Sequence, residues 1–90
     1  MTQTRRERIH SIDAKLYLYG PLPSLQSELE AILDEETSDF NMMPEGLRDS
    51  GRGVESKEAQ IYLQKAIKGL SGKKKTQELM DEVHECLRWV

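Results

Sequence analysis

The sequence predicts an all-α fold, a small helical bundle made of two helical hairpins in a single domain over residues 1–90. Apolar residues recur at spacings of three and four along most of the chain, which is the period of one face of an α-helix. Clusters of Gly, Pro and Ser separate these periodic segments, as is typical between helices. A chain of 90 residues suits one domain with a modest core, a size at which self-association often adds stability. A homodimer is therefore one expectation.

The first helix is expected at about 4–19. Its apolar stripe comprises Ile9, Ile12, Leu16 and Tyr19, with Tyr17 and Leu18 widening it. Gly20 suits the end of this helix because it tolerates a positive φ, and Pro21 and Pro23 stand where a helix cannot continue.

The second helix is expected at about 24–36, with Ser24 as its N-cap. Its apolar stripe comprises Leu25, Leu29, Ile32 and Leu33. Since the connection to the first helix is short, the two helices should pack as an antiparallel hairpin.

A long loop is expected over 37–55, because the apolar periodicity disappears there. The helix-breaking residues of this stretch are Pro44, Gly46, Gly51 and Gly53. A loop of this length needs anchors in the core. We expect Phe40, Met42 or Met43 to fill the core of a hairpin.

The third helix, expected at 56–70 with Ser56 as its N-cap, has the most regular pattern in the chain. Its apolar face comprises Ala59, Tyr62, Leu63, Ala66, Ile67 and Leu70. Gly69 and Gly72 favour an end to this helix, because glycine destabilises a helix interior by about 1 kcal/mol relative to alanine.

The last helix is expected at about 76–89, with Thr76 as a potential cap. Its apolar face comprises Leu79, Met80, Val83, Cys86, Leu87 and Val90. The alternative is that the third and fourth helices form one continuous helix bent at Gly72.

The charge distribution gives little support to a surface built for nucleic acid. The net charge is −3, whereas a phosphate-binding face needs an excess of Lys and Arg. Residues 24–45 contain seven acidic residues and no Lys or Arg, whereas lysines predominate over 65–75. The opposite charges of neighbouring helices can therefore screen one another. Nucleic-acid contact stays open as an alternative through Arg5, Arg6, Arg8, Lys73, Lys74 and Lys75.

No residue pattern indicates catalysis, a cofactor or a metal site. His84 and Cys86 are two residues apart, so their side chains point in different directions on a helix. Cys86 is the only cysteine, and no apolar run reaches the roughly 20 residues of a membrane span. The polar start MTQTRRER does not open a secretory signal. We therefore expect a cytoplasmic protein that is not an enzyme and does not insert into membranes.

Aromatic and cationic residues are the candidates for binding a partner. Tyr17 and Tyr19 near the end of the first helix, and Trp89 near the end of the last, combine apolar area with a polar group, as interface residues often do. Arg48 and Arg52 belong to the expected loop, where side chains are accessible.

The chain resembles the N-terminal region of the RinA/ArpU-like transcriptional regulators of phages and prophages in Gram-positive bacteria. The matching features are the stretch KLYLYG at 15–20, a helix rich in Glu and Leu at 25–36, a loop with Gly and Arg at 46–54, and a helix that opens with Ser56 and Glu58. Members of the family continue into a helix-turn-helix similar to the fourth region of sigma factors, which residues 1–90 do not contain. They also carry Pro and Thr where this chain has Glu55, Ser56 and Lys57.

The resemblance implies a phage or prophage regulatory or adaptor protein that acts by protein contacts. Its partner would be a full-length regulator, the transcription machinery or another host factor. Two alternatives come from other classes: a nucleic-acid-binding module that uses the N-terminal arginines with the lysines at 73–75, and a structural accessory protein of a phage particle.

Overall fold

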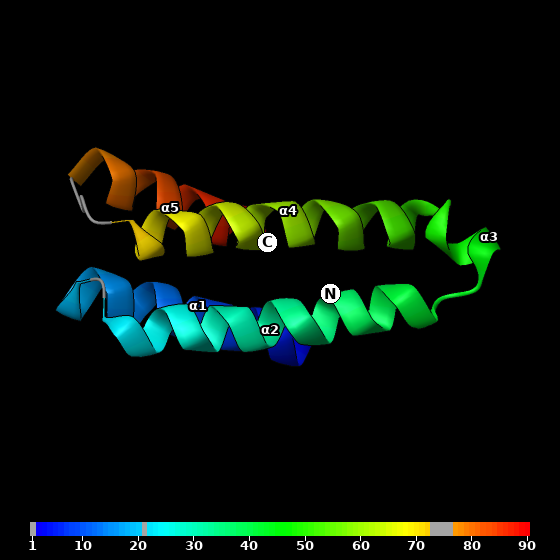
Figure 1. The fold of residues 1–90 in the computed structure, drawn as a ribbon, viewed down its shortest axis with the longest axis horizontal. Coiled ribbons are helices and arrows are strands. Elements are labelled where there is room, and N and C mark those ends of the chain that lie inside the picture. The colour runs from blue at the N-terminus through cyan, green and yellow to red at the C-terminus, as the bar shows by residue number, and fades with distance from the viewer. Residues whose placement is uncertain (1, 21, 73–76) are drawn as a thin grey trace.

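The computed structural model describes residues 2–20, 22–72 and 77–90, and it confirms the all-α fold. Within these residues the chain forms helices and no strands. The helices are α1 (Gln3–Tyr19), α2 (Pro23–Met42), α3 (Glu45–Arg48), α4 (Gly51–Ser71) and α5 (Gln77–Trp89) (Figure 1).

The four long helices form an up-and-down bundle. Around the bundle, α1 contacts α2, α2 contacts α4, α4 contacts α5, and α5 contacts α1. Figure 1 shows α1 and α2 in one layer and α4 and α5 in the other, with the short α3 joining α2 to α4 at one end. The Cα atoms span 41 × 20 × 17 Å. Both predicted hairpins are therefore present, and they pack face to face.

The core lies where the four helices face one another. Its buried apolar residues are Ile9, Ile12, Leu16, Leu25, Leu29, Ile32, Leu63, Ala66, Leu70, Met80, Val83 and Leu87. Every long helix contributes three of them. The predicted stripes of α1 and α2 are confirmed at these positions, and Gly20 ends α1 with a φ of +79°.

The loop expected at 37–55 is wrong. α2 continues to Met42, α3 occupies Glu45–Arg48, and α4 begins at Gly51. Gly53 is the one buried residue of 37–55, and polar residues occupy the inward positions on either side of this stretch: Glu36, Ser56 and Gln60. A hydropathy pattern cannot reveal a helix whose inward positions are polar.

Two expected helix caps are also wrong. α2 begins at Pro23 with Leu22 at the N-cap position, and the fixed φ of proline suits the first helical residue. Ser56 lies in the second turn of α4 and is fully buried, so it is not a cap. The cap expected at Thr76 lies outside the described residues.

The residues expected to fill a hairpin core do not do so. Met42 is exposed, and Phe40 and Met43 are half-buried. Phe40 lies instead between two cations, with the guanidinium of Arg48 5.8 Å and the ammonium of Lys57 5.4 Å from its ring centroid. The ring therefore packs at the α3 end of the molecule, outside the main core.

Helices α4 and α5 are separate, so the single bent helix is wrong. α5 folds back along α4, and the two contact each other closely (Figure 1). A Cβ atom at Gly69 would lie 2.6 Å from Cγ2 of Val83. The glycine that was expected to weaken the helix therefore permits the close approach of α5.

Candidate interaction surfaces

A buried polar cluster joins α1, α2 and α4. The carboxylate of Glu36 is 2% exposed and accepts hydrogen bonds from Ser56 Oγ at 2.8 Å and from Arg5 Nη1 at 2.7 Å. Burial raises the pKa of Glu36, but favourable interactions, among them the hydrogen bonds from Ser56 and Arg5, outweigh this effect and hold the pKa below the ordinary value of 4.5. Glu36 is therefore ionised at neutral pH and ties three helices together.

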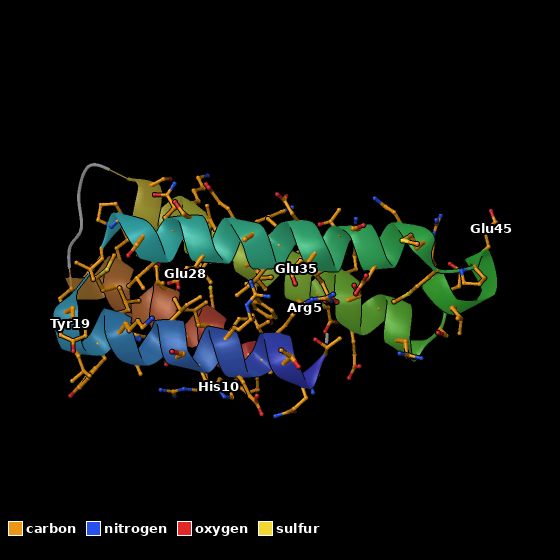
Figure 2. All side chains as sticks on the ribbon, turned by 90° about the horizontal axis from the view of Figure 1, so that it is seen from below. Arg5, His10, Tyr19, Glu28, Glu35 and Glu45 are labelled. Atoms are coloured by element: carbon orange, nitrogen blue, oxygen red, sulfur yellow. The ribbon has the colours of Figure 1, made fainter. Side chains whose placement is uncertain are left out.

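Two of the arginines expected at a nucleic-acid contact point toward carboxylates of α2. Arg5 also pairs with Asp39, and its Nε lies 3.5 Å from Glu35. Arg8 pairs with Glu35 at 2.9 Å. Figure 2 shows Arg5 and Glu35 directed toward each other between α1 and α2. These guanidinium groups are engaged within the fold.

The other residues expected at a nucleic-acid contact are Arg6 and the lysines at 73–75. Arg6 is half-buried and lines a small hollow with Glu55, Glu58 and Trp89. The lysines at 73–75 lie outside the described residues.

A group of exposed apolar side chains lies at the end of the bundle where α1 ends and α2 begins. We call it the end patch; it consists of Tyr17, Leu18, Tyr19 and Leu22, which are 81%, 69%, 69% and 39% exposed. Figure 2 shows Tyr19 at this end of the molecule, opposite Glu45. Tyr19 was expected in the core stripe, but α1 ends there and no neighbouring helix covers it.

Part of the end patch is oriented by α5. The ring of Tyr17 meets the ring of His84 edge-on, with centroids 6.2 Å apart. His84 Nδ1 in turn pairs with the carboxylate of Asp13 on α1. These contacts position one of the exposed aromatic rings relative to the bundle.

A groove of about 650 Å³ runs between α4 and α5. Its lining residues are Tyr62, Lys65, Lys68, Gly69, Leu79, Glu82, Val83, Glu85, Cys86 and Trp89. Trp89 is 67% exposed at one end, so the indole is accessible from solvent. Burial raises the pKa of the Cys86 thiol, an effect that Lys65 partly opposes. Sequence reasoning found Trp89 but not the groove, because the groove depends on how α5 lies along α4.

The structure separates the expected partner-binding residues. Tyr17 and Tyr19 share the end patch, Trp89 lies in the α4–α5 groove, and Arg48 and Arg52 lie near α3. Arg48 donates to the carbonyl of Asn41 and covers Phe40. Leu18 and Leu22 extend the first of these surfaces and were missed as surface residues, because apolar periodicity alone does not show where a neighbouring helix stops.

The described residues contain no group of three or more His, Cys, Asp or Glu side chains placed to hold a metal ion. Among the described helices, none is long and apolar enough to cross a membrane. Comparisons with protein-family models, curated proteins and solved structures found no match.

Proposed function

We propose that this chain is a small regulatory adaptor that acts by binding another protein through the end patch. The observation that carries the proposal is the exposure of consecutive large apolar side chains, Tyr17, Leu18 and Tyr19, on a folded helix. Large apolar side chains that stay exposed on a small protein often mark a contact site. Tyrosine is favoured there because its ring buries area while its hydroxyl forms hydrogen bonds.

The family resemblance supports a phage or prophage regulator, and its KLYLYG stretch includes most of the end patch. On this proposal the chain works in the cytoplasm as a homodimer and binds the transcription machinery or another host factor. Its action is stoichiometric. The engagement of Arg5 and Arg8 by α2 carboxylates argues against the nucleic-acid alternative.

The proposal is tested by affinity capture from a Gram-positive host that carries a prophage. The bait is the chain itself, compared with a variant carrying Tyr17→Ser, Leu18→Ser and Tyr19→Ser. A matched control carries Met42→Ser and Val54→Ser, which remove exposed apolar side chains far from the patch. We expect a host protein that co-purifies in stoichiometric amount with the wild type and the control but not with the patch variant.

Two results would overturn the proposal. One is the same set of proteins on all three baits. The other is a DNA fragment that the purified wild type shifts at low micromolar concentration with steep dependence on salt, which indicates phosphate binding.

A further inference from the structure

We infer that a second copy of this chain covers the groove between α4 and α5, in a symmetric dimer whose two-fold axis runs parallel to the helices. The inference rests on the homodimer of the proposed function and names its interface, which lies on a different face from the end patch. Tyr62 and Trp89 line the groove and offer apolar area that a second copy would remove from water. An apolar groove alone does not identify its occupant, but its charges do.

The two sides of the groove carry opposite charges. Lys65 and Lys68, the α4 lysines, stand on one side, and Glu82 and Glu85, the α5 glutamates, stand on the other. All four side chains are exposed. In the described part of the chain none of them forms an ion pair with another residue. Lys65 Nζ lies 5.9 Å from the ring centroid of Tyr62, a cation–π contact that leaves its charge without a carboxylate partner. Each copy therefore presents charges of both signs beside the same groove that no described ion pair neutralises.

The lysines and glutamates are matched in height along the bundle. Gly69 of α4 lies opposite the turn of α5 between Leu79 and Val83. Helices α4 and α5 are antiparallel (Figure 1), so Lys68 lies level with Glu82. About one helical turn away, Lys65 lies level with Glu85. The charge of Lys65 lowers the pKa of the Cys86 thiol, as expected if Lys65 lies close to the turn of α5 that carries Cys86.

This register determines which symmetric dimer is favourable. A two-fold axis parallel to the helices brings α4 of one copy against α5 of the other at the same height. The α4 lysines then face the α5 glutamates in both halves of the interface, and Tyr62 faces the partner's Trp89. A two-fold axis across the helices would bring α4 against α4 and place lysines opposite lysines, which is unfavourable.

The length of α5 indicates a small contact. α5 has 13 residues and is about 20 Å long, so two helices of about 10 Å diameter offer roughly 400 Å² per copy. Standard stable interfaces bury about 800 Å² per partner. We therefore expect a weak dimer.

The test is a charge exchange followed by sedimentation equilibrium. One variant carries Lys65→Glu and Lys68→Glu, and the other carries Glu82→Lys and Glu85→Lys. Wild type should pass from monomer to dimer between about 1 µM and 1 mM. Each variant alone should have a dissociation constant raised at least about a hundredfold, because like charges meet at the interface. An equimolar mixture of the two should dimerise again, since every lysine then faces a glutamate.

The alkylation rate of Cys86, which lines the groove, tests whether the two copies meet there. Its alkylation rate in the wild type should fall as the protein concentration rises, and in either variant alone it should not change. A wild type that stays monomeric at about 1 mM, variants that dimerise like the wild type, or a mixture that stays monomeric would each overturn the inference.

The end-patch variant with three serines serves as the control, because it should dimerise like the wild type. Loss of its captured host protein without loss of the dimer separates the end patch from the groove. Conversely, charge variants that stay monomeric but still capture that protein would leave the adaptor proposal standing. All four charged side chains are exposed, so circular dichroism should show each charge variant folded.

Discussion

Ser56 of α4 donates its hydroxyl to the buried carboxylate of Glu36 on α2, over 2.8 Å. Arg5 reaches the other oxygen of that carboxylate from α1. The hydrogen bonds thus join helices that are distant in sequence at positions where an apolar residue would be expected. A buried charge is tolerated only when it is paired and hydrogen-bonded, so this cluster restricts how the helices can pack.

We predict that Glu36→Gln lowers the free energy of unfolding by about 2–3 kcal/mol, because it removes the buried negative charge that pairs with Arg5. Glu35→Gln is the matched control. Its carboxylate is 44% exposed, so the loss should stay below about 1 kcal/mol. Urea unfolding followed by circular dichroism measures both losses. Equal losses would show that the buried Glu36 pair stabilises the fold no more than the exposed Glu35 pair.

The lowered pKa of Glu36 predicts a dependence of stability on pH. A carboxyl group whose pKa is lower in the folded than in the unfolded chain stabilises the fold above its unfolded pKa, near 4.5. This contribution is lost as the pH falls below 4.5 toward the folded pKa. Thermal melts between pH 7 and pH 3 should therefore show a smaller decline for Glu36→Gln than for the wild type. Parallel declines would contradict the prediction.

Gly53 should tolerate no side chain. A Cβ atom there would lie 2.0 Å from the carbonyl oxygen of Arg48, which belongs to backbone and cannot rotate away. We predict that Gly53→Ala destabilises the protein by about 1–3 kcal/mol, because α3 must move off α4. Gly51→Ala is the control, since nothing lies within 4 Å of its Cβ position. It should be neutral or stabilise by up to about 1 kcal/mol. Chemical denaturation of both variants decides between these outcomes.

Leu63 and Ile61 test which face of α4 holds the bundle together. Leu63 is fully buried, so Leu63→Ala should cost about 2–5 kcal/mol through lost burial and a cavity. Ile61 is 43% exposed, and Ile61→Ala should cost less than about 1 kcal/mol. Shifts in the urea midpoint give the comparison, and the reverse order would mean that α4 is rotated.

The apolar stripes could be predicted from the sequence because they follow the helical period without interruption. Leu25, Leu29 and Ile32 on α2 and Leu63 and Leu70 on α4 are buried as expected. The same reasoning failed where the buried positions are polar or small. Glu36, Ser56 and Gly53 continue the period, but their burial depends on partners that only the folded arrangement supplies.

The surfaces were harder to predict than the core. Tyr17, Tyr19 and Trp89 were recognised by residue type, yet their exposure follows from where α1 and α5 end relative to their neighbours. The α4–α5 groove requires the antiparallel register set at Gly69, which spacing within one helix does not contain. Sequence patterns therefore indicated which residues could bind a partner but not which of them lie together.

Helices α2 and α4 extend past α1 and α5 at the end that carries α3, so this end is only two long helices thick (Figure 1). Local opening there breaks few apolar contacts and leaves the four-helix region intact. Backbone amides at 37–42 and 51–54 should consequently exchange with deuterium well before those at 25–32 and 63–70. The α3 turn is thus the natural site for inserting a label or an epitope, because it is remote from both the end patch and the α4–α5 groove.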